Sequence, residues 1–98
     1  MYDSKLKSED LDHLYEAVLT LKTPEECYMF FEDLCTISEL MSISQRMKVA
    51  GLLSDHHTTH SISETTGAST ATISRVNRCL NYGAGGYQLV LERLKEKG

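Results

Sequence analysis

The sequence predicts an all-α protein of about six helices, and three observations support this prediction. Proline occurs once, at Pro24. No segment shows the strict alternation of apolar and polar residues that indicates a half-buried strand, whereas apolar residues recur at spacings of three and four. The length of 98 residues suits one domain. We therefore expect a single helical domain over residues 1–98, with dimerisation helices in 1–54, a helix-turn-helix in 58–82 and a C-terminal helix in 86–97.

The first predicted helix begins after Ser8, whose hydroxyl suits an N-cap. Glu9 and Asp10 follow in the first turn, where acidic side chains favour the positive end of the helix dipole. One apolar stripe then runs along the helix, formed by Leu11, Leu14, Tyr15, Val18 and Leu19.

The second and third predicted helices also have clear start signals. Thr23-Pro24-Glu25-Glu26 places an N-cap, a proline and two acids in the favoured order. The third helix is expected from about Thr36 to Leu53, with Glu39 at the capping-box spacing. Their apolar faces consist of Cys27, Phe30, Phe31 and Leu34 in the second helix, and Leu40, Ile43, Met47, Ala50 and Leu53 in the third. A chain of this size cannot easily bury so much apolar surface alone, which favours a homodimer over a compact monomer with a wide core.

The segment 58–82 predicts a helix-turn-helix. A short helix over Thr58–Thr66 is expected to end at Gly67, because such turns adopt a left-handed backbone that a Cβ disfavours. Ser69 would cap the second helix, and the small Ser63 would let the two helices approach closely. The apolar seam between them is predicted to contain Ile62, Ile73, Val76 and Leu80.

The opposite face of the second helix has the composition of a DNA-reading surface. A helical wheel places small, hydroxyl and cationic side chains there, namely Thr70, Ala71, Ser74, Arg75 and Arg78. No carboxylate occurs between Gly67 and Gly86. Such a face can enter a major groove and contact base edges and phosphates. The alternative is an ordinary corner between two helices, which many all-α domains contain.

"YGAGG" interrupts the chain before the last helix. Tyr82 and Tyr87 flank this glycine stop, and both are expected to pack the last helix against the rest of the domain.

Charge is distributed unevenly along the chain, whose net charge is −4. Residues 1–40 contain three lysines and ten acidic residues, whereas residues 41–98 contain seven basic and four acidic residues. The second half can therefore present a face to phosphate although the whole chain is acidic.

Composition also limits location and chemistry. No signal segment or membrane span is evident, and the three cysteines, Cys27, Cys35 and Cys79, suit a reducing cytoplasm, so we expect a cytoplasmic protein. No enzyme signature is present. His56 and His60 have a spacing that a metal could use, but no further ligand completes the set, so no metal site is expected.

The segments "ELMSISQRMKVAGLL" and "TTGASTATISRVNRCL" resemble the tryptophan repressor family, most closely its YerC/YecD branch of repressor homologues. The resemblance spans about Cys27 to Leu94. It implies an intertwined homodimer that represses transcription by binding double-stranded DNA at a palindromic operator. By position, Thr59 and His60 would touch phosphates. The turn and recognition helix would contact DNA through Ser69, Thr70, Ala71, Thr72 and Ser74.

The resemblance also marks an effector pocket, and there this chain departs from the family. Arg46 and Arg75 match the two arginines that sandwich the corepressor, and Thr36 and Thr72 match further pocket positions. However, Val76 stands where the family has a glycine, and Cys79 stands where it has a serine that helps to hold the ligand. An isopropyl group would intrude on the space of an indole ring, and a thiol is a weak hydrogen-bonding partner.

We therefore expect no tryptophan corepressor and no obligatory cofactor. Two alternatives remain open from the sequence. One is a regulator gated by another small carboxylate between Arg46 and Arg75. The other is a protein-interaction module that has lost the ability to read DNA.

Overall fold

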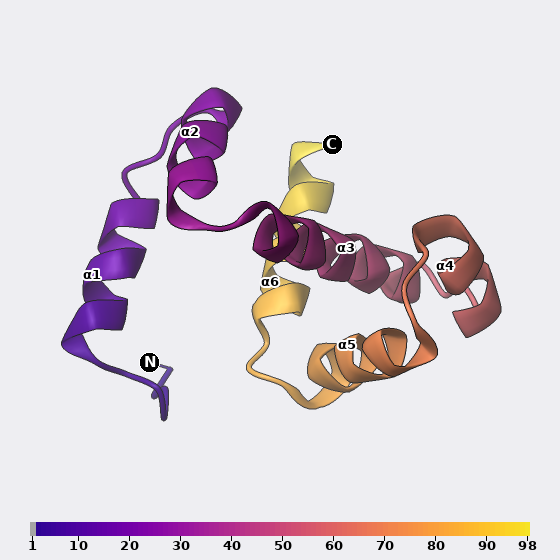
Figure 1. Cartoon of the computed structure of the whole chain (residues 1–98). Coiled ribbons are helices and arrows are strands. Elements are labelled where there is room, and N and C mark those ends of the chain that lie inside the picture. The colour runs from indigo at the N-terminus through magenta and orange to yellow at the C-terminus, as the bar shows by residue number, and fades with distance from the viewer. Residues whose placement is uncertain (1) are drawn as a thin grey trace. The chain divides into compact units, whose positions relative to one another are not determined.

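A computed structural model describes residues 2–98, and in this part of the chain all regular structure is helical. The all-α prediction with six helices is therefore confirmed (Figure 1). The helices are α1 (Glu9–Val18), α2 (Pro24–Leu34), α3 (Ile37–Ser54), α4 (Thr59–Thr66), α5 (Thr70–Tyr82) and α6 (Gly86–Lys97).

Side-chain caps explain why four of the helices begin where they do. The hydroxyl oxygens of Ser8, Thr23, Thr58 and Ser69 each accept a hydrogen bond, at 3.1 Å, from the backbone N–H three residues later. Each cap satisfies a backbone donor that has no partner within its own helix. Thr58 is therefore the cap of α4 in extended backbone, and the helix begins one residue later than the sequence predicted.

The chain divides into two compact units, residues 1–37 and residues 38–98. In the second unit, α5 packs against both α4 and α6. Its core consists of Val49, Ala50, Ile62, Ala68, Ile73 and Val76, all at most 2% exposed. The predicted seam of Ile62, Ile73 and Val76 is thus buried, while Leu80 is half-buried.

The C-terminal half of α3 belongs to this core, and the assignment of residues 1–54 to dimerisation stays a prediction. Val49 is fully buried beside Ala50, and it lay outside the apolar stripe predicted for this helix. Ile43 belonged to that stripe and is 46% exposed. Only tertiary packing decides which side of a helix is covered, and the Val49–Ala50 side is the one that faces the α4–α5 core.

Tyr82 and Tyr87 lie on either side of the turn before α6, and both were expected to pack α6 against the rest of the domain. Tyr87 packs against the core, whereas Tyr82 is 88% exposed, so the expectation for Tyr82 was wrong. Tyr82 is the last residue of α5, beyond the half-buried Leu80, and its side chain is left in solvent.

In the first unit, neither α1 nor α2 contains a buried residue. The rings of Phe30 and Phe31 meet edge to face, with centroids 5.4 Å apart. Large apolar side chains remain exposed nearby, among them Leu19 and Tyr28. None of the described helices combines the length and the apolar character that crossing a bilayer requires.

Candidate nucleic-acid interface

The turn between α4 and α5 has the left-handed conformation that the sequence predicted. Gly67 has φ +74°, and its N–H donates to the carbonyl of Ser63 at 2.9 Å. Hydroxyl groups close the turn further. Ser63 Oγ donates to the carbonyl of Ala68 at 3.0 Å, and Thr66 Oγ1 accepts from the Ala68 N–H at 3.1 Å. These bonds fix the direction in which α5 leaves the turn.

A contact from α3 supports the same turn, and sequence reasoning missed it. Gln45 Nε2 donates to the carbonyl of Thr66 at 3.2 Å, across a separation of 21 residues. This carbonyl belongs to the last turn of α4, where helices leave acceptors unsatisfied. Gln45 therefore connects α3 to the helix-turn-helix through a polar contact as well as through the core.

The first turn of α5 uses two of the predicted DNA contacts for its own structure. Ser69 Oγ accepts from the Thr72 N–H and also hydrogen-bonds Thr72 Oγ1, both at 3.1 Å. Thr72 is half-buried, whereas Thr70, Ala71 and Ser74 are exposed. The structure thus presents Thr70, Ala71 and Ser74 to solvent. Ser69 is exposed as well, but together with the half-buried Thr72 it also forms the cap of α5.

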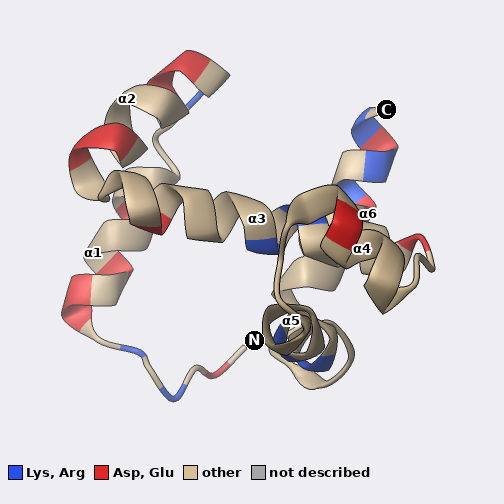
Figure 2. Cartoon of the chain, turned by 45° about the vertical axis from the view of Figure 1, so that its right-hand side comes forward, with Lys and Arg blue, Asp and Glu red and all other residues tan. Residues whose placement is uncertain are grey.

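The exposed face of α5 is cationic. Arg75 and Arg78 are both exposed on this helix. Figure 2 shows blue but no red on α5, whereas red is prominent on α1 and α2. No acidic residue occurs between Glu64 and Glu92. A polyanion can therefore approach this helix without meeting a carboxylate on it.

The two residues predicted to contact phosphate at the start of α4 have an acidic residue close by, unlike the exposed face of α5. Thr59 and His60 are both exposed, as a contact with DNA requires. His60 Nε2 lies 3.1 Å from Glu64 Oε1, one helical turn later. This carboxylate would compete with a phosphate for the His60 side chain, and the phosphate contacts of Thr59 and His60 stay a prediction.

The six predicted effector-pocket residues do not share one environment. Thr36 belongs to the first unit and the other five belong to the second. Val76 is 2% exposed within the core, Arg46 is half-buried, and Arg75 and Cys79 are exposed. The Val76 isopropyl group is therefore a packing element of the helix-turn-helix.

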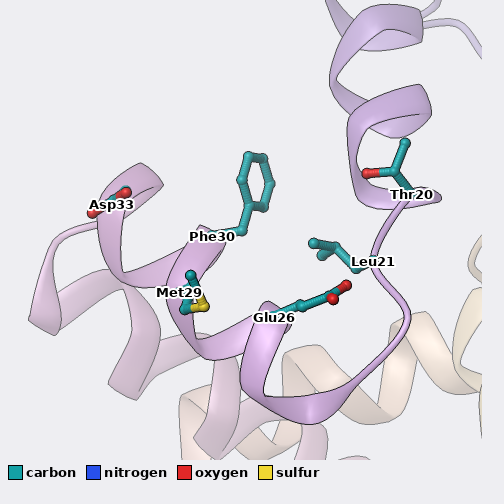
Figure 3. A pocket seen from close by; sticks show the side chains of 6 residues that line it. All are labelled: Thr20, Leu21, Glu26, Met29, Phe30 and Asp33. Atoms are coloured by element: carbon teal, nitrogen blue, oxygen red, sulfur yellow. The ribbon is translucent and has the colours of Figure 1, made fainter.

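A cavity in the first unit is lined partly by acidic side chains, in contrast to the cationic face of α5. It has a volume of about 330 Å³ and lies between the end of α1 and one side of α2 (Figure 3). Glu26 and Asp33 line it beside apolar side chains, and Glu26 Oε1 accepts from the Lys22 N–H at 2.9 Å. Its two carboxylates make it unsuited to nucleic acid. Within residues 2–98, no three His, Cys, Asp or Glu side chains are grouped as metal ligands.

Comparisons with known proteins agree with this arrangement. The sequence profile of the Trp repressor protein family matches residues 9–95. The chain is 54% identical over 96 residues to the uncharacterized protein YerC of Bacillus subtilis (strain 168), covering 98% of this chain and 92% of YerC. The crystal structure of a TrpR-like protein from Eubacterium eligens ATCC 27750 matches with a TM-score of 0.90 and 56% identity, over 95% of this chain and 96% of that one. A Trp repressor candidate from Staphylococcus aureus matches with a TM-score of 0.89 and 48% identity, over 93% and 91% of the two chains.

Proposed function

The chain belongs to the Trp repressor protein family, in its YerC branch, and from this premise we propose that it is a homodimeric, sequence-specific DNA-binding regulator. We expect the protein to be cytoplasmic and to repress transcription from a roughly palindromic operator. The two half-sites of this operator would lie about one helical turn of DNA apart, as the two-fold symmetry of a helix-turn-helix dimer requires.

One observation carries the proposal, namely the exposed face of α5. Thr70, Ala71 and Ser74 are small enough to let the helix backbone approach base edges. Arg75 and Arg78 add two cations that can reach bases or phosphates. A rigid turn at Gly67 presents this face, and the surrounding sequence is free of carboxylates. A protein-interaction surface has no need of this combination.

The exposed apolar side chains support the homodimer. No residue of α1, α2 or α6 is buried within one chain. Leu19 is 83% exposed and Ile37 is 81% exposed. Extended apolar faces of this kind are typical of chains that fold together with a partner. A second copy of the chain would cover them.

Val76 supports regulation without tryptophan. In the core it already packs among side chains from α3, α4 and α5. An indole ring that entered this position would have to displace a buried side chain, and protein cores resist such changes in volume. Isothermal titration calorimetry with tryptophan is expected to show no binding, and a micromolar dissociation constant would refute this part of the proposal.

Selection from random duplex DNA at moderate salt, with no added ligand, tests the proposed function. The wild-type protein is expected to enrich a two-fold symmetric motif, and Arg78→Ala is expected to weaken it. Arg93→Ala makes the same chemical change on α6 and is the matched control, with no loss expected. If the wild-type protein enriches nothing, it is not a ligand-independent DNA reader.

A further inference from the structure

Two asparagines on the exposed face of α5 form a hydrogen-bonded pair. Asn77 and Asn81 are one helical turn apart, and both are exposed. They share a side of the helix with Thr70 and Ser74, since residues spaced by three, four and seven lie on one face. Asparagine is a weaker helix former than alanine, lysine or glutamine. Two asparagines on one face therefore reduce the stability of α5 relative to those residues.

The two side chains are joined in a way that fixes their orientation. Asn81 Nδ2 donates to the backbone carbonyl of Asn77 at 2.9 Å and to Asn77 Oδ1 at 3.0 Å. A carbonyl only accepts, so the nitrogen of the Asn81 amide must face it. The second hydrogen of that nitrogen then requires an acceptor, which makes the facing atom of Asn77 its oxygen.

This pairing leaves Asn77 with a defined set of free groups. Both hydrogens of Asn77 Nδ2 are unused, and Oδ1 keeps one lone pair. The amide thus offers a donor and an acceptor side by side. The major-groove edge of adenine offers the complement, with N7 as acceptor and the N6 amino group as donor. A phosphate presents acceptors only, so it would leave Oδ1 facing a negative group.

From this geometry we infer that Asn77 reads an adenine in each half-site, and that Asn81 is the positioning residue that holds its amide. The inference rests on the proposed function, because it requires α5 to lie in a major groove. It adds one specific base contact to the arginines and small side chains already described.

The test begins with the duplex that the wild-type protein selects, followed by a panel of duplexes in which each base pair of the half-site is replaced in turn. The wild-type protein is expected to prefer A·T at one position by roughly 5- to 150-fold, the range of a good bidentate contact. Asn77→Ala is expected to remove the preference at that position and to leave the others in place. Asn81→Ala is expected to weaken the preference at the same position only.

Asn77→Asp supplies a sharper readout, because it keeps the shape of the side chain and removes both donors. It is expected to shift the preference from adenine toward cytosine, whose N4 amino group is a donor. Both alanine variants are expected to melt at or above the wild-type temperature, because both side chains are exposed and alanine is the better helix former. Asn77→Asp is expected to stay folded at the temperature of the binding assay, so a change in base preference would not come from unfolding.

If Asn77→Ala lost affinity equally for every duplex of the panel, the residue would contact a phosphate and the inference would be overturned. If Asn77→Ala kept the wild-type affinity for every duplex, the inference would be overturned as well. The proposed function would stand in both cases. If the wild-type protein selects no motif at all, the proposed function fails and the inference fails with it.

Discussion

Replacing Gly67 by alanine is expected to destabilise the protein by about 1–2 kcal/mol. This is the cost that a Cβ adds to a left-handed backbone, and Gly67 has φ +74°. Steric crowding adds nothing, because an added Cβ would meet no atom within 4 Å. The loss therefore comes from the backbone conformation alone, which makes its size predictable.

Gly86→Ala is the matched control for this substitution. Gly86 also has open space around an added Cβ, but it lies at the start of α6 without a positive φ. Alanine there restricts the unfolded chain and is expected to stabilise the protein by about 0.4–1 kcal/mol. The same chemical change should thus have opposite signs at two glycines of one chain.

Thermal unfolding at one fixed protein concentration measures both effects. In a domain of this size a change of 1 kcal/mol moves the midpoint by about 4–8 °C. Gly67→Ala should melt below the wild-type protein and Gly86→Ala at or above it. If Gly67→Ala melted at the wild-type temperature, residue 67 would not have a left-handed backbone conformation. The orientation of α5 relative to α4 would then differ from the one described.

Three further predictions concern the caps, the core and the assembly. Ser69→Ala removes the cap of α5 and is expected to cost about 1 kcal/mol in chemical unfolding, whereas no change would show that the hydroxyl does not cap the helix. Ile62→Ala empties a fully buried site and is expected to cost about 2–5 kcal/mol, and a loss below 1 kcal/mol would contradict its place in the core. The thermal midpoint of the wild-type protein is expected to rise with protein concentration, as unfolding of a dimer requires, and a constant midpoint would favour a monomer.

The parts of this fold that the sequence predicts well are those that neighbouring residues determine. Ser8, Thr23 and Ser69 cap their helices because the donor they satisfy is three residues away. Gly67 ends α4 because a local turn needs its positive φ. Ile62 and Ile73 are buried because the α4–α5 corner has only one apolar side.

The parts that the sequence does not predict depend on contacts between distant residues. Val49 replaces Ile43 as a core residue of α3 because other helices cover one side of α3, which its own periodicity does not specify. The bond from Gln45 to Thr66 joins residues 21 positions apart. The pair of Asn77 and Asn81 is different, since its spacing of four already indicates a helical contact.

The salt dependence of binding tests whether the arginine-bearing face of α5 binds the backbone and bases of DNA. Affinity for the selected duplex would be measured by fluorescence anisotropy over a series of salt concentrations, for the wild-type protein, Arg75→Ala, Arg78→Ala and Arg93→Ala. The logarithm of the binding constant should fall linearly with the logarithm of salt, with a slope of about −0.9 for each phosphate neutralised. Substitution of an α5 arginine that contacts phosphate should make the slope less negative by about 1, and Arg93→Ala should leave it unchanged. An affinity that does not respond to salt, or that depends on Arg93 and on neither α5 arginine, would show that this face of α5 does not bind DNA.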